Sequence, residues 1–143
     1  MTREHHHFSA DTPARANPAQ RRRLAERLRA ICDQRHVLAE PAELKPYECD
    51  GLSAYRHVPL LVVLPDSVEQ VQQVLQLCRD EGVPVIARGA GTGLSGGALP
   101  REDAVLLSLA RLNRILDIDR ANTRARVQPG VRNLAISEAA KPY

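Results

Sequence analysis

A glycine-rich segment directly after an apolar strand sets the strongest limit on the architecture of this chain. Residues 84–87 read Pro-Val-Ile-Ala, and residues 88–97 read Arg-Gly-Ala-Gly-Thr-Gly-Leu-Ser-Gly-Gly, with five of the chain's eight glycines. Glycine tolerates positive φ angles and lets backbone N–H groups approach a ligand closely, and successive N–H groups in a turn form an anion-binding concavity. The segment therefore predicts a phosphate or pyrophosphate cradle, to which the Thr92 and Ser95 hydroxyls add. The alternative is a flexible surface loop.

The residues before this loop have the pattern of a strand, a helix and a second strand. Residues 60–64 form a continuous apolar run, typical of a strand buried on both faces, and residues 85–87 form a second run. Between them, either Asp66 or Ser67 is the expected helix cap, and Gly82 is the expected end. The apolar face of this helix is expected to contain Val68, Val71, Val74, Leu75 and Cys78. Such a unit implies parallel pairing with a right-handed crossover and a ligand site at the carboxyl ends of the strands.

The flanking segments are less regular. Asn17 is the expected cap of a helix whose apolar face includes Leu24, Leu28 and Ile31. Residues 37–59 contain three prolines and predict irregular structure with a short helical turn. Further elements are predicted as a strand over residues 104–109, a hairpin of residues 115–118 and 125–128, and a helix over residues 131–140.

These patterns predict an α/β (α+β) fold that combines a βαβ unit with an antiparallel hairpin. We expect three parts: a disordered arm over residues 1–17, a helical and irregular segment over residues 18–59, and the α/β unit over residues 60–143.

Two common phosphate loops fit the glycine segment poorly. A Walker A loop ends in Gly-Lys followed by Ser or Thr, whereas Gly96 is followed by Gly97 and Ala98. Residues 91–96 match the dinucleotide pattern GxGxxG, and Asp117 follows about 20 residues later, as a ribose-binding acid would. A Rossmann loop, however, opens directly into a helix. The NAD interpretation therefore requires a helix over residues 104–109, where the apolar run favours a strand.

Composition excludes several other functions. The chain has no Trp, one Phe and three Tyr, which is too few aromatic rings for a stacking platform that binds single-stranded nucleic acid. Residues 1–36 carry 8 Arg and 4 acidic residues, so the net charge of +3 arises there, on what we interpret as a solvated helix face. No apolar run approaches the ~18 residues of a membrane span.

The cysteines and histidines predict neither a disulfide framework nor a metal site. The three cysteines, Cys32, Cys49 and Cys78, are odd in number and form no CxxC pair. Free thiols fit a cytoplasmic protein, and Cys78 is expected in the core. The histidine run at residues 5–7 has no convincing partner ligands, and Cys32 with His36 is interpreted as structural.

Taken in order, the segments resemble the FAD-binding domain of the vanillyl-alcohol oxidase / p-cresol methylhydroxylase (PCMH) flavoprotein family. The resemblance rests on the strand–helix unit 61–78, on residues 84–97, on Asn113, Ile115 and Asp117, and on residues 127–131. Residues 46–55 and 126–137 are similar to the FAD-linked subunits of bacterial glycolate oxidases. The resemblance covers about residues 44–143.

The resemblance implies FAD as the cofactor, with its pyrophosphate held by the glycine loop and with residues 129–131 near it by backbone contact. It implies oxidation of a 2-hydroxy acid such as glycolate or D-lactate, and partner glycolate oxidase subunits that could hold the enzyme at the inner membrane. The cofactor-binding residues expected on this basis are Arg88, Gly89, Ala90, Gly91, Thr92, Gly93, Ser95, Gly96, Pro129, Gly130 and Val131. Arg88 could instead be a structural partner of Glu48 or Asp50.

The family also has a later glycine-rich segment and a substrate-binding domain that match nothing here. We therefore expect the chain to be an N-terminal, incomplete part of the domain, inactive by itself, and assign it no catalytic residue. The alternative is a truncated or stand-alone nucleotide-binding or structural module without redox activity.

Overall fold

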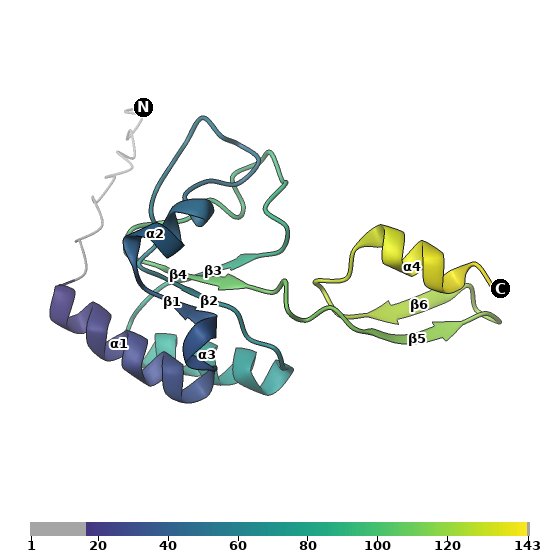
Figure 1. Cartoon of the computed structure of the whole chain (residues 1–143), viewed down its shortest axis with the longest axis horizontal. Coiled ribbons are helices and arrows are strands. Elements are labelled where there is room, and N and C mark those ends of the chain that lie inside the picture. The colour runs from purple at the N-terminus through teal and green to yellow at the C-terminus, as the bar shows by residue number, and fades with distance from the viewer. Residues whose placement is uncertain (1–16, 143) are drawn as a thin grey trace, which may run out of the picture.

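The apolar runs predicted as strands form a parallel sheet that is the centre of the first of two lobes (Figure 1). The computed structural model describes residues 17–142; the predicted arm lies almost wholly outside them. The elements of the first lobe are α1 (Pro18–Ile31), η1 (Gln34–His36), β1 (Val37–Leu38), α2 (Pro41–Leu44), η2 (Lys45–Tyr47), β2 (Leu61–Val63), α3 (Val68–Asp80), β3 (Val85–Arg88) and β4 (Val105–Ser108). The second lobe contains β5 (Ile115–Asp119), β6 (Arg124–Val127) and α4 (Asn133–Ala140).

The strand order β1-β2-β4-β3 corrects one detail of the predicted βαβ unit. β2 and β3 are parallel, as expected, but each pairs with β4 and not with the other: Val62 is opposite Leu106, and so is Ile86. β4 lies between β2 and β3, and all its residues are buried. β1 pairs antiparallel with β2; this strand was missed because it is two residues long and has no alternating pattern.

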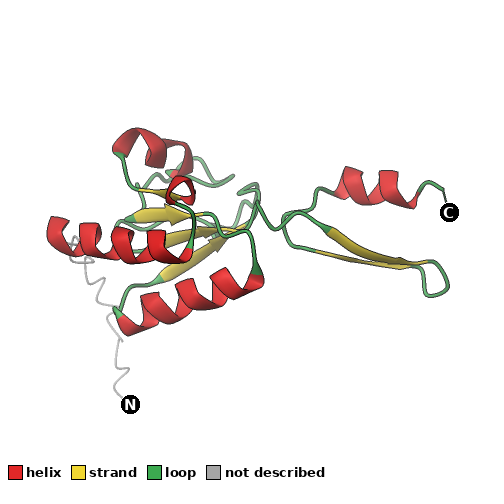
Figure 2. Ribbon diagram, turned by 60° about the horizontal axis from the view of Figure 1, so that its bottom comes forward, coloured by secondary structure: helices red, strands yellow, loops and turns green. Residues whose placement is uncertain are grey.

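The main core lies between the sheet and the helices α1 and α3, which run along one of its faces (Figure 2). Leu24 and Leu28 of α1 and Val74 and Cys78 of α3 are fully buried there, each apolar side chain contributing about 1.5–3 kcal/mol. The prediction that Val68 and Leu75 belong to the buried face is wrong, because their side chains are 55% and 45% exposed. The helical rotation instead turns Leu77 inward.

The predicted helix ends are confirmed. The Asn17 side chain accepts a hydrogen bond from the N–H of Ala19 at 3.0 Å. Of the two candidate caps for α3, Ser67 is the one used, because its Oγ accepts from the N–H of Gln70 at 3.2 Å. Gly82 follows α3 at φ +64°, the left-handed conformation in which many helices end.

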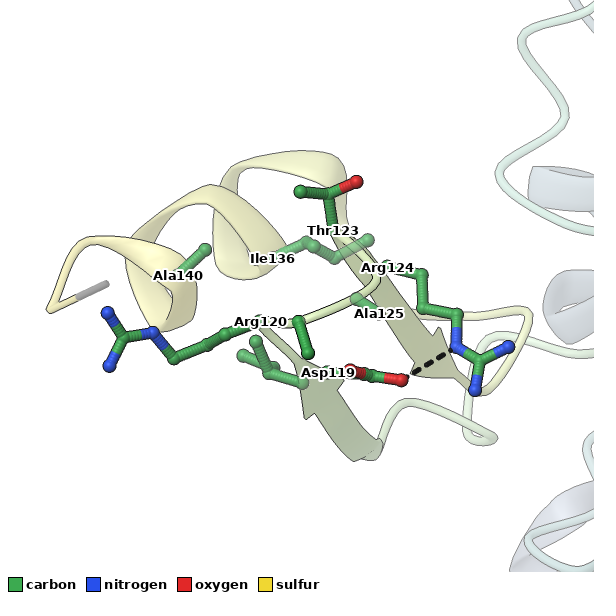
Figure 3. Close-up of a pocket in the computed structure, with 9 residues that line it drawn as sticks. Asp119, Arg120, Thr123, Arg124, Ala125, Ile136 and Ala140 are labelled. Carbon is green, nitrogen blue, oxygen red and sulfur yellow. Dashed lines mark hydrogen bonds and ion pairs between the residues drawn. The ribbon is translucent and has the colours of Figure 1, made fainter.

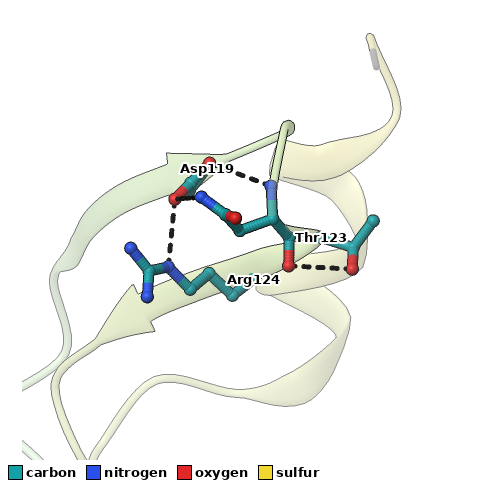
Figure 4. Close-up of polar contacts among 4 residues, drawn as sticks. Asp119, Thr123 and Arg124 are labelled. Carbon is teal, nitrogen blue, oxygen red and sulfur yellow. Dashed lines mark hydrogen bonds and ion pairs between the residues drawn. The ribbon is translucent and has the colours of Figure 1, made fainter.

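The second lobe is the predicted hairpin with α4 beside it. Asp119 closes the turn: its carboxylate accepts from the N–H of Asn122 at 3.1 Å and from Arg124 Nε at 3.0 Å (Figure 4). The side-chain amide of Asn122 also donates to this carboxylate, at 2.8 Å. That hydrogen bond is the largest cause of a lowered pKa of Asp119, and the bonds from the Asn122 N–H and from Arg124 act in the same direction. No residue of α4 is buried, and Leu134 is 68% exposed.

Candidate functional site

The glycine loop leaves the carboxyl edge of the parallel sheet, where the sequence predicted a ligand site. β3 ends at Arg88, and β4 ends beside it, with the N–H of Leu109 donating to the carbonyl of Arg88 at 2.9 Å. Gly91 and Gly96 both have φ +71°, which L-residues with a side chain rarely adopt. The loop is thus shaped by positive-φ glycines at two points.

The backbone of this loop offers unused donors. Within the part of the chain that the structure describes, no N–H of residues 90–98 donates a hydrogen bond to another residue. Thr92, Gly93 and Ser95 are exposed. Backbone N–H groups require an acceptor, and several of them on one glycine-rich turn suit an anion. The loop therefore fits a phosphate or pyrophosphate group.

The turn at residues 49–52 supports the loop. A Cβ atom on Gly51 would lie 2.6 Å from the carbonyl oxygen of Thr92 and 2.7 Å from that of Gly93, so the two backbones touch. Asp50 is buried and holds the turn through Oδ1, which accepts from the N–H of Leu52 at 2.9 Å. Its Oδ2 is buried without a hydrogen-bond partner among the described residues. Asp-Gly at residues 50–51 is a common turn pair and does not by itself indicate contact with a distant loop, so this support was not predicted.

Arg88 lies under the loop. Its Nη1 donates to the carbonyl of Cys49 at 2.5 Å, and its guanidinium carbon is 5.7 Å from the ring centroid of Tyr47. The suggested ion pairs with Glu48 or Asp50 do not form: Glu48 binds Arg56 instead, at 2.5 Å. Within the described residues, the hydrogen-bond partner of Arg88 is therefore a backbone carbonyl and not a carboxylate.

Residues 129–131 pack against Leu109, which follows β4 at the carboxyl edge of the sheet. The N–H of Gly130 donates to Leu112 at 2.8 Å, and a Cβ on Gly130 would lie 2.6 Å from the carbonyl oxygen of Leu109. The N–H of Val131 donates to the Gln128 carbonyl at 3.1 Å, which makes the turn predicted for Pro129 and Gly130. Because both N–H groups are used internally, this segment could contact a ligand only through carbonyls or side chains.

Three further observations concern features outside the glycine loop. A groove of about 830 Å³ lies between the hairpin and α4, lined by aliphatic side chains such as Ile118, Ala125 and Ile136, in the other lobe from the glycine loop (Figure 3). No cluster of three or more potential metal ligands occurs among residues 17–142. The NAD interpretation requires a helix over residues 104–109. Residues 105–108 form a strand instead, which rules that interpretation out.

The model of the family described as "FAD binding domain" matches residues 59–143. The chain belongs to the FAD binding domain family. The glycine loop, β4 and the segment 129–131 all lie inside the matched region. The predicted family and its cofactor, FAD, are thereby confirmed.

Curated relatives of this FAD binding domain include the glycolate oxidase subunit GlcD of Escherichia coli (strain K12), 63% identical over 107 residues that make up 75% of this chain and 21% of that protein. The D-2-hydroxyglutarate dehydrogenase of Xanthomonas citri pv. viticola is 39% identical over 102 residues, 71% of this chain and 22% of that protein. The chain thus spans about a fifth of the length of these relatives.

A crystal structure of p-cresol methylhydroxylase with substrate bound has the same fold, with a TM-score of 0.79 and 27% identity over 89% of this chain and 25% of the other. The predicted PCMH-type FAD-binding fold is therefore confirmed. None of the helices described is long and apolar enough to cross a membrane.

Proposed function

We propose that this chain provides the FAD-pyrophosphate cradle of a flavoenzyme that oxidises a 2-hydroxy acid. The observation that carries the proposal is the loop at residues 89–97, with positive φ at Gly91 and Gly96 and unused backbone N–H groups at the carboxyl edge of the sheet. Relatives named for glycolate oxidase and D-2-hydroxyglutarate dehydrogenase support the substrate class.

In this proposal the chain binds and orients, and it carries no acid or base for the reaction. The loop N–H groups, from Gly89 to Gly96, donate to the pyrophosphate oxygens, and the Thr92 and Ser95 hydroxyls add donors. The residues 129–131 border the cofactor through carbonyls or side chains. When bound, FAD would supply the redox chemistry, as the acceptor of the hydride that leaves the α-carbon of the hydroxy acid.

The proposed setting is a multi-subunit enzyme in the cytoplasm, attached to the inner membrane through other subunits. The subunit name of the relative GlcD supports a complex. The free thiols of Cys32, Cys49 and Cys78 support a reducing compartment.

The first prediction tests whether the loop binds a negatively charged group. Gly91→Asp abolishes FAD binding, because a side chain at this position is strained at positive φ and its Cβ overlaps the Arg88 guanidinium beneath the loop, so the turn cannot keep its shape. Ser95→Asp weakens the affinity for FAD at least about tenfold by charge repulsion. Ser95→Asn introduces a neutral side chain of the same shape as Asp, and it changes the affinity by less than about threefold. Isothermal titration with FAD and the flavin absorbance of the purified protein measure both effects.

Retained flavin absorbance in Gly91→Asp, or equal affinities of the two Ser95 variants, contradicts the proposed cradle. The same absorption spectrum distinguishes the proposed flavoenzyme function from the alternative function. A purified wild-type protein that takes up no FAD is a nucleotide-binding or structural module without redox activity, whereas a stoichiometric yellow chromophore rules that alternative out.

A further inference from the structure

The side chain of Arg88 is the one cation held directly beneath the glycine loop in the described part of the chain, and its surroundings are specific. A Cβ atom on Gly91 would overlap the guanidinium atoms Cζ, Nη2 and Nε, so the guanidinium lies against the α-carbon of that glycine. Its own backbone is fixed by the hydrogen bond from Leu109. Arg88 therefore touches the loop at the residue whose conformation is most unusual.

The guanidinium is held by neutral groups. The Cys49 carbonyl accepts from Nη1 at 2.5 Å, and the Tyr47 ring lies 5.7 Å from the guanidinium carbon, within the range of a cation–π contact. Both belong to the segment that also presses Gly51 against the loop. The segment thus positions the charge and the loop together.

No carboxylate of residues 17–142 neutralises this charge at contact distance. Among residues 17–142, Arg88 forms no ion pair within 4.0 Å. Glu48 pairs with Arg56, and Oδ1 of Asp50 accepts from the N–H of Leu52. Arg88 is only partly exposed. A half-buried cation without a paired carboxylate raises the electrostatic potential of the loop lying against it.

From these contacts we infer that Arg88 is a positioning residue of the pyrophosphate cradle. It acts through Gly91: it fixes the positive-φ turn from behind and supplies a permanent positive charge to the bound phosphates without being one of their hydrogen-bond donors. The inference rests on the proposed FAD site. It gives Arg88 an indirect role there, whereas the resemblance implied that Arg88 binds the cofactor directly.

The test compares FAD affinity and its salt dependence in the purified protein. Arg88→Gln keeps a donor for Cys49 and loses the charge. We expect about tenfold weaker FAD binding and a shallower slope of log Kd against log NaCl concentration, because one screened charge is gone. Arg88→Lys keeps the charge, and we expect the wild-type slope with affinity within about threefold.

Arg101→Gln is the matched control, since Arg101 is an exposed arginine that pairs with Asp103 at 2.6 Å before β4 begins. It should change neither the affinity nor the slope. The inference is overturned if Arg88→Gln binds FAD with the affinity of the wild-type protein. It is also overturned if Arg88→Gln binds FAD more weakly but with an unchanged salt slope, because a purely structural role does not alter the slope.

Circular dichroism verifies that each variant is folded. If Arg88→Gln unfolds, the test rests on Arg88→Lys. If the salt dependence of FAD binding by Arg88→Lys has the same slope as in the wild-type protein, the inference is supported. A tenfold loss of affinity in a folded Arg88→Lys overturns it. Absence of FAD binding by the wild-type protein overturns the proposed function itself, and the role of Arg88 falls with it.

Discussion

Side-chain burial divides the three cysteines into two kinds. Cys32 and Cys78 are sealed in the core at 1% and 0% exposure, whereas Cys49 is half-buried next to the glycine loop. Burial raises the pKa of Cys78 to about 11 and that of Cys32 to about 11, where the Asp66 carboxylate adds to the effect. Only the thiolate reacts as a nucleophile, so a raised pKa slows the reaction of a thiol.

We predict that a disulfide reagent at pH 8 titrates one thiol of the native protein rapidly, at Cys49. At that pH only about one in a thousand of the two core thiols is ionised, and both are also inaccessible. Denaturant should expose all three thiols. Cys49→Ser should remove the fast phase; a fast phase that persists in this variant contradicts the assignment.

Among the elements, the loop gains its shape from a segment about forty residues earlier in the chain. The turn at residues 49–52 touches the loop at Thr92 and Gly93, and Leu52 lies 3.8 Å from a Cβ built on Gly96. Backbone carbonyls cannot move aside as a flexible side chain can. The loop is thus held from outside as well as by its own positive-φ glycines.

Gly51→Ala should therefore weaken both the fold and the site. The added methyl group meets two carbonyl oxygens, which we expect to cost about 1–3 kcal/mol of unfolding free energy and to weaken FAD binding. Urea denaturation and FAD titration measure the two effects. Gly97→Ala is the control for stability, because a Cβ there meets nothing within 4 Å; equal stability of the two variants would show that the contact is not tight.

At the scale of the whole molecule, the two lobes differ in how much apolar surface they bury. β2 and β4 are buried at every position, whereas α4 has no buried residue, and Leu116 of β5 is 49% exposed. The lobes join where Gly130 packs on the carbonyls after β4. Regions with few buried apolar contacts open with a lower free energy than the core.

Hydrogen exchange of the purified 143-residue chain should show this difference. We expect the slowest amides in β2 and β4, and exchange in β5, β6 and α4 that is faster by at least about an order of magnitude, because the second lobe can open while the sheet stays intact. Uniform protection across the two lobes would mean that they unfold as one cooperative unit.

The sequence by itself determined most of the local elements, and it predicted an anion-binding loop. The Asn17 cap, the apolar run of β2 and the glycines of residues 88–97 each depend on a few neighbouring residues, so the sequence pattern is enough to predict them. Only the tertiary structure decided that β4 separates β2 from β3, that Val68 and Leu75 face outward, and that Arg88 binds the Cys49 carbonyl. Those outcomes depend on contacts between residues far apart in the chain. Several pairings fit the local sequence pattern equally well, and the packing of the whole fold decides which of them forms.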